Sequence, residues 1–149
     1  MNKKLRVVLD TNVLISVSFL RRSSTLNTIY EAIKNQEFIL ILSHSILQEI
    51  EEVSAREKIV KRTVMSEKER IKFIENLIEI CFVVPGKKDI KVVQADPDDD
   101  KFVIAATEGF ADYIVSGDDD LLELKEYEGI KILTPKEFLA IITNDVSNQ

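Results

Sequence analysis

Five short apolar runs, each bounded by polar or turn residues, are the feature of this chain that most constrains its fold. They are rich in β-branched and aromatic residues and lie at 6–9, 38–42, 82–84, 113–115 and 130–133. Their apolar character is nearly continuous rather than alternating, which predicts strands covered on both faces, as in a parallel sheet. We therefore expect a buried sheet of five parallel strands.

Helical patterns fill the gaps between these runs. Apolar stripes at helical spacing follow start signals at Ser24, Ser45, Ser66, Asp96 and Thr134. Two of these signals read as capping boxes, formed by Ser45 with Gln48 and by Ser66 with Glu69. The charged segment 55–64 is compatible with either an extra helix or a mobile arm. Strands that alternate with helices predict right-handed crossovers and a three-layer α/β/α sandwich with a five-stranded parallel sheet.

The length of 149 residues suits one domain, spanning 1–149 with a core from about 5 to 142. The net charge is −6, from 26 acidic and 20 basic side chains. This balance argues against a protein that coats nucleic acid through a broad positive face. It still allows one that meets phosphate through bound metal ions, which a count of side chains omits.

Cys81 is the only cysteine, so an intrachain disulfide is excluded. It lies in an apolar run, where we expect a buried and unreactive thiol in a reducing compartment. No uninterrupted apolar run is long enough to cross a bilayer. We therefore expect a cytoplasmic protein that does not associate with a membrane.

Acidic residues gather where the strands of the predicted sheet end. Asp10 follows the first strand directly, and Asp118 follows the fourth. Glu49 lies one turn into the helix after the second strand, and 98–100 form the first turn of the helix before the fourth. In an open parallel sheet, ligands bind beyond the carboxyl ends of the strands. Taken singly, each acid is equally explained as a turn former, a helix cap or a solvated surface residue.

Their combination points to a metal site. Several carboxylates held close together repel one another, so they must take up protons or bind a cation. Oxygen ligands without paired histidine or cysteine favour Mg²⁺ or Mn²⁺ over Zn²⁺. Such a site suits hydrolysis of a phosphodiester, because metal ions activate water and stabilise charge on the attacking and leaving oxygens.

Three segments resemble the motifs of PIN-domain nucleases. Residues 7–16 (VVLDTNVLIS) look like the opening of that family, and 96–102 (DPDDDKF) and 111–122 (ADYIVSGDDDLL) resemble its third and fourth acidic motifs. The likeness runs from Leu5 to about Phe138. Within the family, the chain is most similar to the VapC-like toxin components of prokaryotic toxin–antitoxin systems. The resemblance implies a parallel five-stranded sandwich, in agreement with the pattern of strands and helices.

The resemblance also assigns roles to individual residues. It implies four metal-binding and catalytic acids, Asp10, Glu49, Asp99 and Asp118. Auxiliary roles fall on Thr11, Asn12, Asp100, Ser116 and Asp120. Asp100 stands where the family usually has Asn, so the choice between Asp99 and Asp100 as the third acid stays open.

The function implied is that of a metal-dependent endoribonuclease that cleaves RNA and leaves 5′-phosphate ends. The toxin resemblance further implies an antitoxin protein as partner and a homodimer. One alternative is a non-catalytic module of the same fold that binds protein or RNA. Phosphate-handling α/β proteins fit poorly: a dehalogenase-like phosphatase needs Asp where Asn12 stands, and a receiver domain needs an acceptor Asp where Pro85 and Gly86 follow the third strand.

Overall fold

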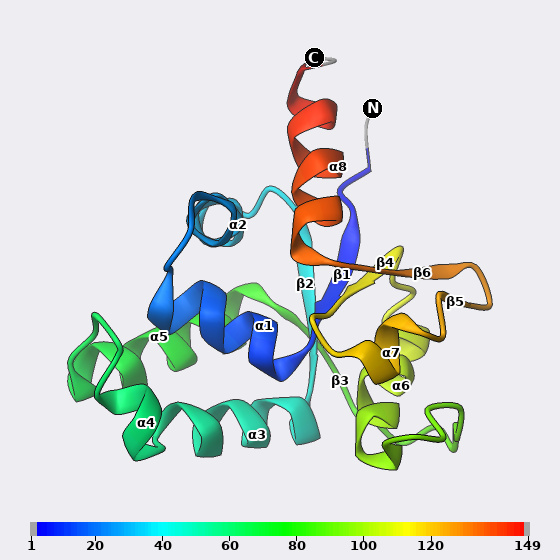
Figure 1. The fold of residues 1–149 in the computed structure, drawn as a ribbon, viewed down its shortest axis with the longest axis horizontal. Helices are drawn as coiled ribbons and strands as arrows, with labels where there is room; N and C mark the ends of the chain where they lie inside the picture. The colour runs from blue at the N-terminus through cyan, green and yellow to red at the C-terminus, as the bar shows by residue number, and fades with distance from the viewer. Residues whose placement is uncertain (1–2, 148–149) are drawn as a thin grey trace.

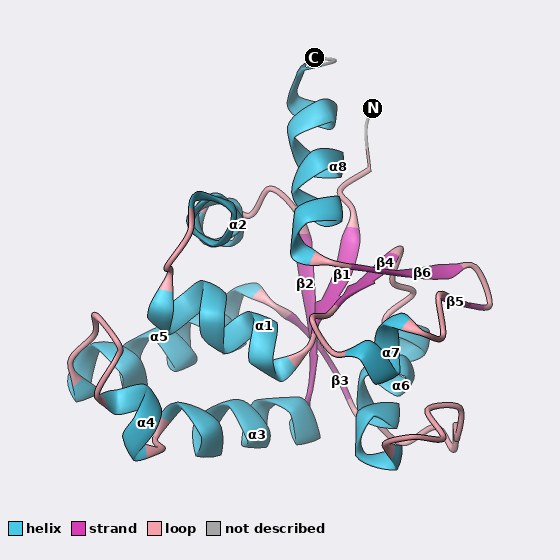
Figure 2. Ribbon diagram, in the orientation of Figure 1, coloured by secondary structure: helices cyan, strands magenta, loops and turns pink. Residues whose placement is uncertain are grey.

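A central sheet with helices on both sides forms the core of the protein. The structure, a computed structural model, describes residues 3–147, with side chains described for 3–144. The strands are β1 (Arg6–Leu9), β2 (Ile39–Ser43), β3 (Phe82–Val84), β4 (Tyr113–Val115), β5 (Glu126–Tyr127) and β6 (Ile130–Leu133). They lie in the order β3-β2-β1-β4-β6-β5, and every pair is parallel except β5 with β6. The predicted parallel sheet is confirmed, with the antiparallel β5 added at one edge (Figure 2).

Helices cover the two faces of this sheet and give the predicted three-layer α/β/α fold. They are α1 (Thr11–Ile15), the π-helix η1 (Ser16–Leu20), α2 (Ser24–Lys34), α3 (His44–Ser54), α4 (Glu57–Val60), α5 (Glu67–Ile80), the 3-10 turn η2 (Pro97–Asp99), α6 (Asp100–Glu108), α7 (Asp119–Leu122) and α8 (Pro135–Ser147). In the view of Figure 1, α1, α2 and α5 lie to one side of the central strands, and α6 and α7 lie to the other. Helix α6 packs across β1, β2 and β4, and the turn that precedes it lies close to the segment that follows β4.

The central strands are buried on both faces, as their continuous apolar runs predict. Val8 of β1, Ile41 of β2 and Ile114 of β4 are fully buried. The expectation is wrong for β3, where Phe82 is 45% exposed and Val83 is also exposed. Because β3 is the edge strand of the sheet, its outer side has no neighbouring strand among the described residues, and the guanidinium of Arg6 lies over the Phe82 ring at 4.6 Å.

Of the two capping boxes predicted at helix N-termini, one is present in the structure and one is not. The capping box of Ser66 and Glu69 is confirmed, with both of its hydrogen bonds present. The box of Ser45 and Gln48 is wrong: α3 begins at His44, and the hydroxyl of Ser43 accepts the hydrogen bond from the Ile46 N–H at 3.3 Å. Ser45 therefore lies inside the first turn instead of capping it.

The segments 55–64 and 97–108 both contain helix. Residues 55–64, left open between a helix and an arm, contain the short helix α4. The helix predicted after Asp96 is present as η2 followed by α6, and it ends at Gly109. At that point the backbone approaches β2 so closely that a Cβ on Gly109 would lie 2.7 Å from Ile41 Cγ2, which explains a glycine there.

Cys81 is half-buried, and burial raises the pKa of its thiol to about 12. The thiol is therefore protonated at neutral pH and a poor nucleophile, as expected. Across residues 3–147, no helix combines the length and the apolar character needed to span a membrane.

Candidate metal centre

The site is built where two neighbouring parallel strands end. In the register of β1 with β4, Leu9 is paired with Val115, so Asp10 and Ser116 are the first residues beyond the sheet on adjacent strands. The Asp10 N–H donates to the Val115 carbonyl at 2.9 Å, which continues the ladder one step past the strands. Asp10 and Ser116 are both buried. The two segments are therefore fixed side by side at the carboxyl edge of the sheet.

Hydrogen bonds hold the Asp10 carboxylate in one orientation. One oxygen caps α1 by accepting from the Val13 N–H at 2.8 Å, and the other accepts from the Ser116 hydroxyl. The Ser116 oxygen in turn accepts from the Asp118 N–H at 2.9 Å. Ser116 thus connects Asp10 to the turn that carries Asp118, as expected for an auxiliary residue.

Four further carboxylates meet beside this pair. Asp96, Asp99, Asp118 and Asp120 each offer an oxygen, and these four oxygens all lie within 4.8 Å of one another. Asp96 and Asp99 come from η2 and its cap, whereas Asp118 caps α7 by accepting from the Asp120 N–H at 2.9 Å. We call these four residues the acidic cluster. Segments far apart in the sequence therefore supply one concentrated negative site.

Burial and mutual repulsion change the acidity of the carboxyl groups. The pKa of Asp99 is raised to about 8, first by burial, then by a side-chain hydrogen bond with Asp118, and then by repulsion from the carboxylates of Asp118, Asp96 and Asp10. The pKa of Asp10 is raised as well, chiefly by burial and also by Asp118, although its hydrogen bonds with Ser116 and Val13 act in the opposite direction. Without a cation, part of the negative charge is therefore relieved by bound protons.

One atom of the acidic cluster has no partner. Asp99 is only 8% exposed, and its Oδ2 makes no hydrogen bond to any described residue. A buried, unpaired carboxylate oxygen is costly, so native proteins normally pair it with a donor or a cation. The buried Thr11 hydroxyl, next to Asp10, is likewise unpartnered among the described residues. Carboxylate oxygens without His or Cys are the donor set that Mg²⁺ and Mn²⁺ prefer, so the residues present fit such an ion.

Glu49 lies apart from the acidic cluster. Its carboxylate pairs with the ammonium of Lys101, which also contacts Asp98 at 3.1 Å. The side chains of Lys101 and Glu49 are 15% and 27% exposed, so the pair is largely shielded from water. Burial acts to lower the pKa of Lys101, but Glu49 and Asp98 raise it overall. The structure thus brings Asp99, Asp118 and Asp120 together beside Asp10, but it places Glu49 in an ion pair.

The two adjacent candidates for the third acid point to different partners. Asp99 belongs to the acidic cluster, whereas one oxygen of Asp100 accepts from the N–H groups of Val92 and Val93 at 3.0 and 2.8 Å. Asp100 therefore anchors the segment before η2 and is not one of the four clustered acids.

Asn12, which was predicted as an auxiliary residue, is exposed. It lines a cavity of about 360 Å³ that Asp118 also lines.

Asp96 was not predicted as a site residue. The sequence indicates it only as a helix cap, and that role is real, because Asp96 accepts from the Asp98 N–H at 3.2 Å. Its membership of the acidic cluster depends on the approach of the turn after β4, which local pattern does not show. The spacing of Asp96 and Asp99, one turn apart, is the signal that was available.

The comparisons with known proteins agree with this arrangement. A family model described as PIN domain matches residues 6–120, a span that begins in β1 and ends with the last acid of the cluster. No curated protein matches the chain. The matched span covers β1 to β4, Asp10 and all four residues of the acidic cluster. The chain belongs to the PIN domain family.

Proposed function

We propose that this protein is a divalent-metal-dependent endoribonuclease whose metal-binding and catalytic acids are Asp10, Asp99 and Asp118. Glu49 is proposed as the fourth acid and would have to leave its ion pair with Lys101 to reach the ion. PIN domains are generally metal-dependent nucleases that act on RNA or other nucleic acid. The observation that carries the proposal is the buried, unpartnered Oδ2 of Asp99 within the acidic cluster. A carboxylate in that position needs either a proton or a cation.

The residues of this site are suited to hold a cation and a phosphodiester together. A bound Mg²⁺ or Mn²⁺ would activate water and neutralise charge on the attacked phosphate. Asp10 is oriented before any ligand arrives, because its two oxygens are held by Val13 and Ser116. Asp99 must release its proton when it becomes a ligand, since its pKa of about 8 leaves it mainly protonated at neutral pH.

The negative charge of the protein supports a polyanionic substrate that binds through a metal ion. The chain carries a net charge of −6, and the acidic cluster adds a strongly negative local field. A polyanion is repelled from such an edge unless a cation is already bound there. Phosphate binding should therefore depend on the ion, which distinguishes this site from a basic RNA-coating surface.

We further propose that the protein is the toxin of a toxin–antitoxin pair, works as a homodimer in the cytoplasm and is blocked by an antitoxin protein. The similarity of 7–16, 96–102 and 111–122 to VapC-like toxins supports this assignment. Induced expression should arrest growth of the host, and Asp10→Asn should abolish the arrest. Unimpaired growth with the wild-type chain expressed would argue against a toxin.

The catalytic proposal is tested by RNA cleavage with purified protein. Wild type should cleave single-stranded RNA in Mg²⁺ or Mn²⁺ to products with 5′-phosphate ends, and a chelator should stop the reaction. Asp10→Asn should be inactive although Asn can still accept from the Val13 N–H. Asp119→Asn is the matched control, because Asp119 is exposed and lies outside the acidic cluster. Equal cleavage by wild type, Asp10→Asn and chelated protein would refute the proposal.

A further inference from the structure

A second hollow adjoins the acidic cluster. It is a cavity of about 580 Å³ between the segment before η2 and helix α6, with Ser45 of α3 at one side. We call it the α6 cavity. Its walls are mainly apolar and come from Ile90, Val93, Pro97 and Ile104. The volume falls within the about 300–1,000 Å³ that is typical of small-molecule sites.

The wall of the α6 cavity is held in place by two acids of one helix. Glu108, near the end of α6, accepts from the three backbone N–H groups of 86–88 at 2.7–2.9 Å. Asp100, at the start of α6, accepts from Val92 and Val93. Both ends of an irregular segment are therefore pinned to α6. The segment that contributes Ile90 and Val93 to the cavity is therefore held at both ends by contacts within the protein.

The α6 cavity and the acidic cluster share one turn of the chain. Pro97 and Asp98 line the cavity, whereas the residues on either side of them, Asp96 and Asp99, belong to the cluster. One short turn thus forms a wall of both. A phosphate bound at the cluster and a base in the cavity would therefore contact neighbouring residues of the same turn.

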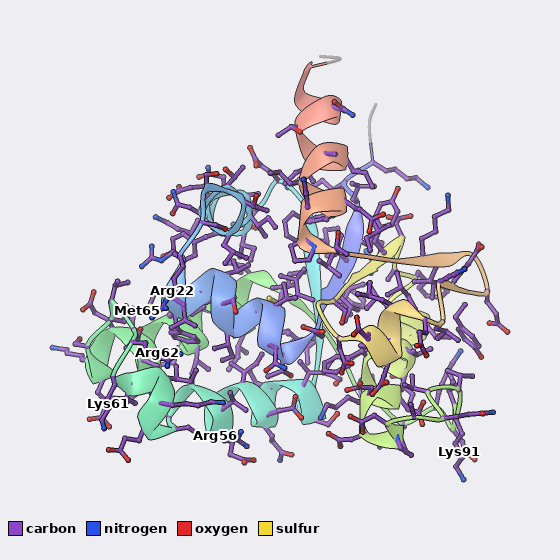
Figure 3. All side chains as sticks on the ribbon, in the orientation of Figure 1. Arg22, Arg56, Lys61, Arg62, Met65 and Lys91 are labelled. Carbon is purple, nitrogen blue, oxygen red and sulfur yellow. The ribbon has the colours of Figure 1, made fainter. Side chains whose placement is uncertain are left out.

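The charges around the α6 cavity favour an uncharged occupant. Lys91 stands at the outer rim and is paired with Asp89 at 4.0 Å, and the ammonium of Lys101 is taken up by Glu49 and Asp98. Figure 3 shows Lys91 at the opposite end of the molecule from Arg22 and Arg62. No net positive charge is left for a phosphate. Apolar walls with a few polar groups suit the faces and edges of a nucleobase instead.

We propose that the α6 cavity binds the base of the nucleotide that flanks the scissile phosphate, and that cleavage therefore depends on this one base being unpaired. This inference rests on the nuclease function proposed above. A base that is paired and stacked in a duplex cannot enter a cavity in the protein, whereas an unpaired base can be turned out of the strand. Cleavage should therefore require an unpaired base next to the bond that is broken.

The test fills the cavity and compares three readouts. Ile104→Trp fills it from α6, Ile90→Trp fills it from the opposite wall, and Ile78→Trp on α5, 43% exposed and outside the cavity, is the matched control. Binding of a labelled single-stranded RNA is measured by anisotropy, cleavage by gel, and the metal site alone by hydrolysis of bis(p-nitrophenyl) phosphate, which has no base. Thermal unfolding shows that each variant is folded.

Both cavity variants should bind and cleave single-stranded RNA about tenfold less well, the scale expected when one base loses its site. They should hydrolyse the small diester at the wild-type rate, and the control should be unchanged throughout. A duplex of the same sequence should be cleaved poorly by the wild type. Folded cavity variants that bind and cleave RNA like wild type would overturn the inference. RNA binding that depends on Ile104 in a protein without cleavage would instead uphold the inference and refute the nuclease proposal.

Discussion

Raising the pH from about 4 to about 8 should lower the free energy of unfolding of the metal-free protein. The group responsible is Asp99, whose pKa moves from 3.8 in the unfolded chain to about 8 in the folded state. Between these values the folded protein holds a proton that the unfolded chain has already released. Stability therefore falls as the pH rises through this window, and the stabilisation is fully present only below it.

The size of the effect follows from the same shift. One carboxyl group that keeps its proton only in the folded state gives a slope of at most about 1.4 kcal/mol per pH unit. Asp96, Asp118 and Asp120 are half-exposed, so water screens part of their repulsion of Asp99. We therefore expect the slope to be about half of this limit. Over the range from about pH 4 to about pH 8, this slope gives a total loss of about 3 kcal/mol in the free energy of unfolding. This is a substantial part of the about 5–15 kcal/mol by which domains are usually stable.

Other acids do not mask this loss. The pKa values of Glu69, Glu108 and Glu137 are lowered from 4.5 by hydrogen bonds to the charged form, against the opposing effect of burial, which is the largest influence at Glu108. Lowered pKa values give stability that is lost as the pH falls below 4.5, which overlaps only the lower end of the window in which Asp99 titrates. The raised pKa of Asp10 acts in the same direction as that of Asp99.

Urea unfolding at a series of pH values in the presence of chelator measures the effect. The chain contains no tryptophan, so far-UV circular dichroism is the suitable signal. Asp99→Asn, which carries no titrating group at this position, should lose most of the slope and be more stable than wild type at pH 8. Saturating Mn²⁺ should remove the decline in the wild type, because the ion replaces the proton. A flat wild-type profile, or an equal slope in Asp99→Asn, would refute the reasoning.

Three further substitutions test contacts around the site. Ser116→Ala should cost about 1–2 kcal/mol in urea unfolding, because a buried hydroxyl that links two site segments is lost. Glu108→Gln should speed amide hydrogen exchange at 86–88, since a charged acceptor of three N–H groups becomes neutral. Lys101→Met should destabilise by about 1–3 kcal/mol by leaving Glu49 unpaired, and adding Glu49→Gln should restore part of the loss.

Each of these substitutions has a result that contradicts its reason. Unchanged stability in Ser116→Ala would mean that the hydroxyl bridge contributes nothing. Unchanged exchange in Glu108→Gln would mean that the segment before η2 is held by other contacts. Strictly additive effects of the changes at Lys101 and Glu49 would show that the two side chains do not interact in solution.

The sheet was predictable because burial on both faces leaves a simple mark in the sequence. A strand covered by helices on each side must be apolar at consecutive positions, and four of the five runs have the bounds that the structure shows. The two-residue strand β5 has no such run. The segment 11–20 was not predicted as helix because it is buried nearly all round, from Val13 to Phe19, and so lacks the polar positions that reveal a helical period.

The site was predictable where strand order alone decides it. Asp10 and Asp118 follow adjacent parallel strands, so their convergence follows from topology. The choice between Asp99 and Asp100 was not predictable from the sequence. The two residues are adjacent in the first turn of a helix, and only tertiary packing decides which of their side chains joins the acidic cluster. Glu49 and Lys101 pair across two helices although they are 52 positions apart in the sequence, so no local sequence pattern predicts their contact.

Anomalous scattering from crystals soaked in Mn²⁺ is the most direct measurement of whether these acids form one metal site. The expected result is a peak at the carboxyl edge of the sheet, in contact with the carboxylates of Asp99 and Asp118 and adjacent to Asp10. The same soak with Asp99→Asn should give a weaker peak or none. An absence of Mn²⁺ at this edge in the wild type, or ions bound only to scattered surface acids, would contradict the assignment.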